Sequence, residues 1–117
     1  DFTSGHFQEI LDDPQADPAL IRRVILCSGK LYYDLAEERQ RREIKDCALI
    51  RVEQLYPLND AMLRGILSRY RKASLFGWAQ EESQNMGAWS FIEPRLRAMG
   101  IDVQYVGRDA SASPATI

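Results

Sequence analysis

The chain has 117 residues, of which 45% are hydrophobic and 27% are charged, and this length and composition are typical of one globular domain. Its 15 basic and 17 acidic residues give a net charge of -2, whereas nucleic-acid binding normally needs a basic excess. The longest apolar runs, at residues 24–27 and 47–50, are too short to cross a bilayer. We therefore expect neither a nucleic-acid partner nor a membrane.

Residues 1–18 have the composition of a loop, with Gly5, two prolines and five acidic residues. We expect them to form an N-terminal arm or linker, attached to the domain by the apolar side chains of Phe7, Ile10 and Leu11. His6 is the only histidine, and a metal site is not expected because no second ligand lies near it in the sequence. The α/β domain is predicted to span residues 19–107, and residues 108–117, rich in Ala and Ser, are predicted to begin a C-terminal tail.

Four short apolar segments predict strands, at residues 24–27, 47–52, 75–79 and 102–106. The first two lack polar alternation and should be buried on both faces of a sheet, whereas the fourth alternates and suits a position nearer the edge. Helical periodicity falls between them, at residues 31–43, 59–70 and 88–99. This alternation predicts an α/β fold, a mostly parallel sheet with helices on both faces.

Four residues make specific local predictions. Asn59 or Asp60 should cap the second helix. Gly77, inside a strand, indicates that another group packs closely against the backbone. Pro94 should bend the third helix or divide it in two.

The two cysteines, Cys27 and Cys47, both lie in apolar segments. We expect buried, reduced thiols, and reduced thiols indicate a cytosolic type of compartment.

The most informative stretch runs from Trp78 to Trp89, where a strand gives way to a polar loop and then to a helix. In a parallel sheet the loops that follow the strands meet at one edge, which is where α/β proteins usually bind ligands or partners. We expect this edge to carry a site for an anionic effector or a protein interface. Its candidate residues are Ser28, Lys30, Arg51, Gln80, Glu81, Glu82, Asn85 and Trp89.

A purely structural interpretation stays open for the same residues, in which Glu81 and Glu82 cap the loop and pair with nearby arginines. The sequence lacks the phosphate-binding loop G-x-x-x-x-G-K-[ST], the dinucleotide motif G-x-G-x-x-G, the nucleophile elbow G-x-S-x-G and paired C-x-x-C motifs. A Ser-His-Asp triad would have to use His6, which lies before every predicted strand. We therefore predict no catalytic residue in this chain.

Several segments resemble the C-terminal domain of 2-oxoglutarate dehydrogenase. They read RVILCSGKLYYDL at residues 23–35, IRVEQLYP at 50–57, QEE at 80–82, NMGAW at 85–89, YVGR at 105–108 and SPAT at 113–116, and residues 1–5 resemble the start of this domain. The resemblance covers nearly the whole chain in order. It implies a transketolase-like C-terminal domain, agreeing with the predicted α/β fold.

The resemblance also implies a function for a longer protein. Such an enzyme uses thiamine diphosphate and magnesium, bound in an earlier domain, to decarboxylate 2-oxoglutarate, and it transfers the succinyl group to the lipoyl-bearing succinyltransferase component. This domain would contact upstream domains and a homodimer partner, and in some members it helps to bind acetyl-CoA or adenine nucleotides. Relatives that act on 2-oxoadipate share most of these segments. The compartment would be the bacterial cytoplasm or the mitochondrial matrix.

Overall fold

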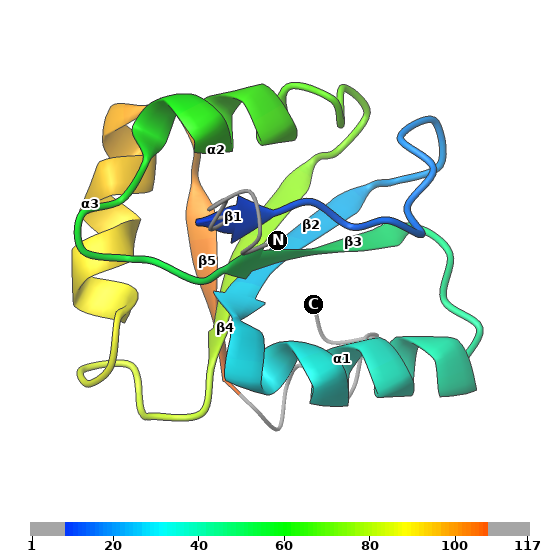
Figure 1. Ribbon diagram of the computed structural model, residues 1–117, viewed down its shortest axis with the longest axis horizontal. Helices are drawn as coiled ribbons and strands as arrows, with labels where there is room; N and C mark the ends of the chain where they lie inside the picture. The colour runs from blue at the N-terminus through cyan, green and yellow to red at the C-terminus, as the bar shows by residue number, and fades with distance from the viewer. Residues whose placement is uncertain (1–8, 108–117) are drawn as a thin grey trace, which may run out of the picture.

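The computed structural model of the chain describes residues 9–107 and shows a five-stranded sheet with three helices (Figure 1). In chain order the elements are β1 (Ile10–Leu11), β2 (Arg23–Ser28), α1 (Gly29–Arg41), β3 (Cys47–Val52), α2 (Asp60–Leu67), β4 (Leu75–Gln80), α3 (Trp89–Ala98) and β5 (Val103–Gly107). The spatial order of the strands is β1-β3-β2-β4-β5. β2 to β5 are parallel to their neighbours, and only β1 is antiparallel, to β3. The predicted fold class is confirmed, and β5 lies at an edge as predicted.

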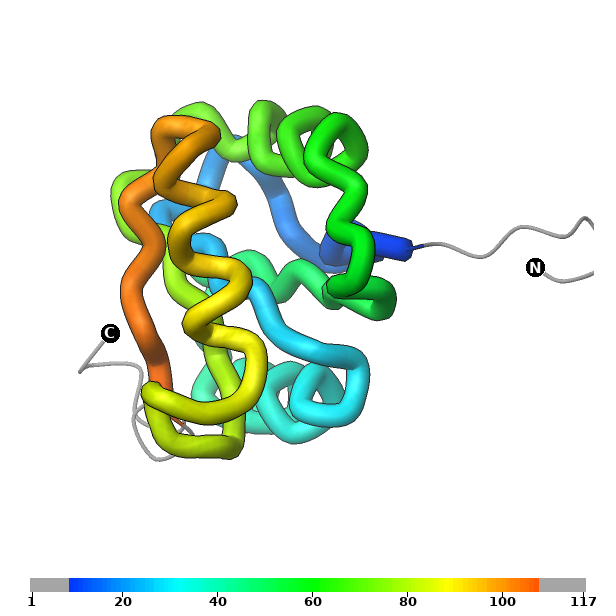
Figure 2. Tube along the Cα trace, turned by 90° about the vertical axis from the view of Figure 1, so that its left-hand side faces the viewer, coloured from blue at the N-terminus to red at the C-terminus, as the bar shows by residue number. Residues whose placement is uncertain are grey.

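The sheet separates two apolar cores because the side chains of its strands alternate between the faces. Val24 and Leu26 of β2 belong to the core beneath α2 and α3, whereas Ile25 and Cys27 belong to the core beneath α1. α1 lies on one side of the sheet and α2 and α3 on the other (Figures 1 and 2). All four of these β2 side chains are at most 2% exposed, so the uninterrupted apolar sequence reports burial on both faces.

Two of the local predictions are confirmed. The Asn59 side chain caps α2 by accepting a hydrogen bond from the Met62 backbone N–H at 3.0 Å. A Cβ atom at Gly77 would lie 2.9 Å from Val106 Cγ2, so any larger residue would collide with β5.

Pro94 does not divide the third helix, because α3 is continuous from Trp89 to Ala98. The missing proline N–H leaves only the Ser90 carbonyl without its usual partner. Ser90 is exposed, and water can therefore satisfy that carbonyl at little cost. None of the helices formed by residues 9–107 is long and apolar enough to span a membrane.

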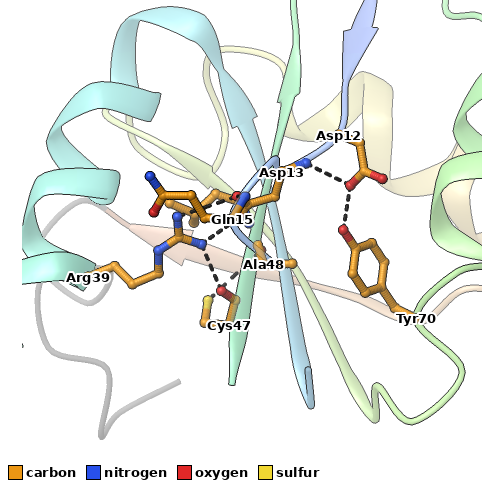
Figure 3. A network of polar contacts seen from close by, with 8 residues as sticks. Asp12, Asp13, Gln15, Arg39, Cys47, Ala48 and Tyr70 are labelled. Carbon is orange, nitrogen blue, oxygen red and sulfur yellow. Dashed lines mark hydrogen bonds and ion pairs between the residues drawn. The ribbon is translucent and has the colours of Figure 1, made fainter. Parts of the chain in front are cut away.

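The N-terminal arm is more ordered than its loop-like composition predicts, since Ile10 and Leu11 pair with Val52 and Arg51 on the outer edge of β3. Further along the arm, the buried Asp13 carboxylate accepts a hydrogen bond from the Leu49 backbone N–H at 2.9 Å. It also forms an ion pair with Arg39 of α1 (Figure 3). The arm therefore covers the edge of β3 and leaves less of it open to pairing with another chain.

Arg39 and Asp12 extend this attachment to both faces of the sheet (Figure 3). Arg39 donates a hydrogen bond to the Cys47 carbonyl at 2.9 Å. On the other side Asp12 accepts hydrogen bonds from Arg69 and from the Tyr70 hydroxyl. Phe7, which was also predicted to attach the arm, lies outside the described residues, as does His6.

Replacing Asp13 with alanine tests this attachment. The substitution leaves the partly buried Arg39 guanidinium without its carboxylate and the buried Leu49 N–H without its acceptor, so we expect a loss of about 3 kcal/mol in the free energy of unfolding. Urea unfolding of the chain followed by circular dichroism measures it. Asp17→Ala removes an exposed carboxylate from the same arm and should cost below about 1 kcal/mol. Equal losses for the two variants would show that the buried pair does not hold the arm.

Candidate functional site

The carboxyl ends of β2 and β4 bring two of the predicted strand-end loops together around a small pocket of about 180 Å³. The pocket lies between the start of α1 and the start of α3. Its lining includes five of the eight candidate residues, namely Ser28, Lys30, Gln80, Glu81 and Glu82. The structure thus confirms that these residues meet at one edge of the sheet.

Gln80 is the centre of this loop, and its side chain is fully occupied by contacts within the chain. Gln80 is polar, yet only 5% of its surface is exposed to solvent. The amide oxygen Oε1 accepts hydrogen bonds from Trp78 Nε1 at 2.8 Å and from the Trp89 backbone N–H at 3.0 Å. The amide nitrogen Nε2 donates to the carbonyls of Ser83 at 2.9 Å and Met86 at 2.7 Å. Gln80 therefore shapes the loop from within and has no group left for a ligand.

The loop is held from the sheet as well. The Tyr105 hydroxyl of β5 donates a hydrogen bond to the Glu82 carbonyl at 2.8 Å. The Tyr105 ring meets the Trp89 ring edge to face, with centroids 5.7 Å apart. Gly87 has φ +67°, and a Cβ there would lie 2.9 Å from Glu82 Oε1, so the turn requires glycine. These contacts fix the backbone between β4 and α3.

Arg51 lies apart from this pocket, in a cluster with two tyrosines of α1. Its guanidinium carbon is 4.7 Å from the centre of the Tyr32 ring and 5.5 Å from that of Tyr33. Its Nη1 donates a hydrogen bond to the Tyr33 hydroxyl at 3.0 Å. The Arg51 Nε is also 3.9 Å from a carboxylate oxygen of Glu53. Arg51 therefore does not line the pocket that Lys30 lines.

Glu53 places a negative charge at the amino end of α1, which lies at the edge predicted to bind an anionic effector or a protein partner. A Cβ at Gly29, the first residue of α1, would lie 2.3 Å from Glu53 Oε2, so the carboxylate rests directly against that helix end. A carboxylate there is favourable because the helix dipole makes this end positive. The internal carboxylate thus takes the place of an external anion.

The charges around the pocket do not favour an anion either. Its lining contains one cation, Lys30, and two carboxylates, Glu81 and Glu82, and all three residues are exposed. Asn85 and Trp89 lie outside the pocket and line an adjacent open hollow with Gln84, Ser90 and Glu93. Within the loop, Asn85 Oδ1 accepts a hydrogen bond from the Ser83 hydroxyl at 2.9 Å.

Three aromatic residues at this edge, Tyr33, Tyr56 and Phe91, were not among the predicted site residues, and neither was Met86. Tyr33 and Tyr56 are both 64% exposed, and Met86 is 60% exposed. Tyr56 packs on Phe91 of α3 with ring centroids 4.4 Å apart, and Arg95 lies 4.4 Å above the Phe91 ring. Tyr56 could have been predicted from the Leu-Tyr-Pro sequence of the loop after β3, since an aromatic residue in a strand-end loop is suited to contact a partner.

Cys27 is a buried core residue, as predicted, whereas Cys47 is only partly buried and packs against the same core. Burial raises the pKa of the Cys27 thiol to about 12 and that of the Cys47 thiol to about 11, so both are protonated near neutral pH. Both are free thiols, as predicted. Residues 9–107 contain no group of three or more His, Cys, Asp or Glu side chains arranged to hold a metal ion.

Replacing Gln80 with leucine tests whether the amide organises the loop. The substitution leaves the Trp78 indole N–H and the loop carbonyls without partners, and we expect a loss of about 3 kcal/mol in the free energy of unfolding. Urea unfolding monitored by tryptophan fluorescence measures it. Gln84→Leu changes an exposed glutamine of the same loop and should cost below about 0.5 kcal/mol. A small loss for Gln80→Leu, similar to that of this control, would contradict the role of the amide.

Comparison with known proteins identifies the relatives of this chain. The family model described as "2-oxoglutarate dehydrogenase C-terminal" matches residues 1–117. The chain is 56% identical over 105 residues to the 2-oxoglutarate dehydrogenase E1 components of Brucella anthropi, Brucella ovis and Brucella abortus. The match covers 84% of this chain and 10% of each relative, so the chain spans about a tenth of their length. The chain therefore belongs to the 2-oxoglutarate dehydrogenase C-terminal family.

Proposed function

We propose that this chain is the C-terminal domain of a full-length enzyme that oxidatively decarboxylates 2-oxoglutarate and transfers the succinyl group to a lipoyl domain of the succinyltransferase component. The observation that carries the proposal is the family match over the whole chain, together with 56% identity to proteins named as E1 components. 2-Oxoadipate is the alternative substrate. Such an enzyme would work in the bacterial cytoplasm or the mitochondrial matrix.

The described residues do not suit the cofactor that this activity implies. Thiamine diphosphate binds through a magnesium ion, and magnesium prefers carboxylate and carbonyl oxygens in octahedral geometry. Glu81 and Glu82 are the carboxylates at the pocket, but no third metal-ligating group joins them among residues 9–107. We propose that the cofactor and the catalytic residues belong to other domains of the full-length enzyme.

For this domain we propose a packing role, in which the carboxyl edge of its sheet contacts another domain or the partner subunit of a homodimer. Among residues 9–107, three of the four exposed large hydrophobic side chains are at this edge: Tyr33, Tyr56 and Met86. The two tyrosines are held by neighbours, Tyr33 by Arg51 and Tyr56 by Phe91. Aromatic groups that are already oriented lose little entropy on association and are typical of interface anchors.

The contacts at this edge support packing over the effector role. Gln80 has no free hydrogen-bonding group, Arg51 is engaged with Tyr33, and Glu53 covers the amino end of α1. A pocket of about 180 Å³ is also smaller than the usual range of about 300–1,000 Å³ for small-molecule sites. The adjacent hollow of about 570 Å³ is large enough, but its lining contains the carboxylate of Glu93 and no cation to bind an anionic effector. An acetyl-CoA or adenine-nucleotide site would therefore need surfaces beyond those described.

Turnover by the full-length enzyme tests the proposed activity. With 2-oxoglutarate, thiamine diphosphate, magnesium and ferricyanide as electron acceptor, we expect ferricyanide reduction that depends on both the thiamine cofactor and the metal. Reactions without thiamine diphosphate are the control. A higher kcat/KM for 2-oxoadipate would assign the alternative substrate, and no thiamine-dependent turnover of either acid would contradict the proposal.

A further inference from the structure

The outer edge of β3, at one side of the sheet, is closed by contacts within the chain. β1 pairs with its carboxyl half. Next to β1, the Asp13 carboxylate accepts a hydrogen bond from the Leu49 N–H, and Arg39 donates one to the Cys47 carbonyl, both at 2.9 Å. An open strand edge can pair with other chains, so these contacts protect the domain on this side.

β5 forms the other edge of the sheet and has no such cover. Figure 2 shows β5, in orange, along one side of the molecule, and no described strand lies outside it. In a strand that is paired on one side only, alternate residues point their N–H and C=O groups outward. Within residues 9–107 no hydrogen bond reaches those groups of β5 from outside the sheet. The register with β4 is unbroken from Phe76↔Val103 to Gln80↔Gly107, so no bulge interrupts the edge.

The residues of β5 leave its edge competent to pair. The sequence Val-Gln-Tyr-Val-Gly contains no charged residue and no proline, the residues with which proteins usually block an open edge. Val103 and Val106 are 5% and 4% exposed and belong to the cores on opposite faces of the sheet. The backbone is therefore held extended before any partner arrives, and pairing costs little ordering entropy.

A second copy of this chain fits the edge. Two β5 strands can pair antiparallel around a twofold axis, and twofold dimers are the commonest oligomers. A register centred on Tyr105 pairs all five residues, with Val103 opposite Gly107 and Gln104 opposite Val106. Because the strand is uncharged, no like charges meet within the pair.

The residues that flank β5 carry complementary charges in the same register. Position 102 of one copy falls opposite position 108 of the other, and the sequence has Asp102 and Arg108 there. Asp102 is exposed and forms no ion pair within residues 9–107, and Arg108 lies outside the described residues. A carboxylate therefore meets a guanidinium at both ends of the paired strands, which favours this register and this partner.

We propose that the outer edge of β5 pairs with β5 of a second copy, antiparallel and centred on Tyr105, so that the two five-stranded sheets join into one. Two strands of five residues bury much less than the roughly 1,200 Å² of a stable interface. The pairing therefore belongs to a larger contact between two subunits of the full-length enzyme. It goes beyond the packing role of the carboxyl edge and does not depend on it.

Disulfide trapping in the full-length enzyme tests the pairing. Gln104→Cys combined with Val106→Cys places thiols at directly opposite positions, where Cα atoms about 4.5–5.5 Å apart suit a disulfide. Within one copy the two Cβ atoms stand about 6.6 Å apart on one face of the strand, beyond the roughly 4.5 Å that a disulfide allows. We expect mild oxidation to give a disulfide-linked dimer, seen by electrophoresis without reductant. Each single variant lacks a directly opposite thiol and should cross-link at least about tenfold more slowly.

Exchange of the flanking charges tests the register. In the enzyme with both cysteines, Asp102→Arg sets two arginines opposite each other at each end and should slow disulfide formation about threefold or more. Adding Arg108→Asp restores opposite charges and should restore the rate. Glu37→Arg is the matched control, because Glu37 is an exposed carboxylate of α1 away from β5, and it should change the rate less than about 1.5-fold.

A second cysteine pair keeps the test independent of the core position Val106. Asp102→Cys combined with Arg108→Cys should link two copies in the same way, since neither residue belongs to the described core. The proposal is overturned if neither cysteine pair links two copies, if the single variants cross-link as fast as the double variant, or if the charge exchange does not restore the rate. Thiamine-dependent turnover, measured on the same preparations under reducing conditions, separates these outcomes from a failure of the proposed activity.

Discussion

The side-chain amide of Gln80 is the interaction on which the carboxyl edge of the sheet depends. One residue at the end of β4 accepts hydrogen bonds from an indole and from the first residue of α3, and it donates to carbonyls of the intervening loop. A buried amide is costly unless its donors and acceptors are satisfied, and here they are. The amide therefore couples the strand, the loop and the helix into one unit.

Because its polar groups are satisfied within the chain, the carboxyl edge differs from an open ligand-binding site. The amino end of α1 is covered by Glu53, and the cation expected to bind an anion, Arg51, lies against Tyr32 and Tyr33. Beside exposed charged residues of the pocket rim, the edge presents outward the large side chains of Tyr33, Tyr56 and Met86. Such a surface suits a domain that packs within a larger enzyme, as expected for a chain that spans about a tenth of its relatives' length.

Much of the fold could be predicted from the sequence, because strands buried on both faces appear as apolar segments without polar alternation. The cap at Asn59 and the close packing at Gly77 could be predicted as well, because each follows from the residue type and its place in a helix or strand. β1 could not be predicted, since a two-residue strand has no periodicity and pairs only because β3 offers an open edge. The roles of individual residues in the candidate site could not be predicted from the sequence either. Gln80 and Arg51 are residue types that often bind ligands, and only the tertiary contacts show that their side chains form hydrogen bonds within the chain instead.

The central claim is that the carboxyl edge is packed against another part of the enzyme, and thiol labelling of the full-length protein tests it most directly. Met86→Cys places a thiol at this edge, where Met86 is 60% exposed in the domain alone, and Ser68→Cys places one on the exposed surface after α2. The account predicts that a maleimide modifies the cysteine at position 86 at least about tenfold more slowly than the one at position 68, because packing excludes the reagent. Equal rates at the two positions would contradict it.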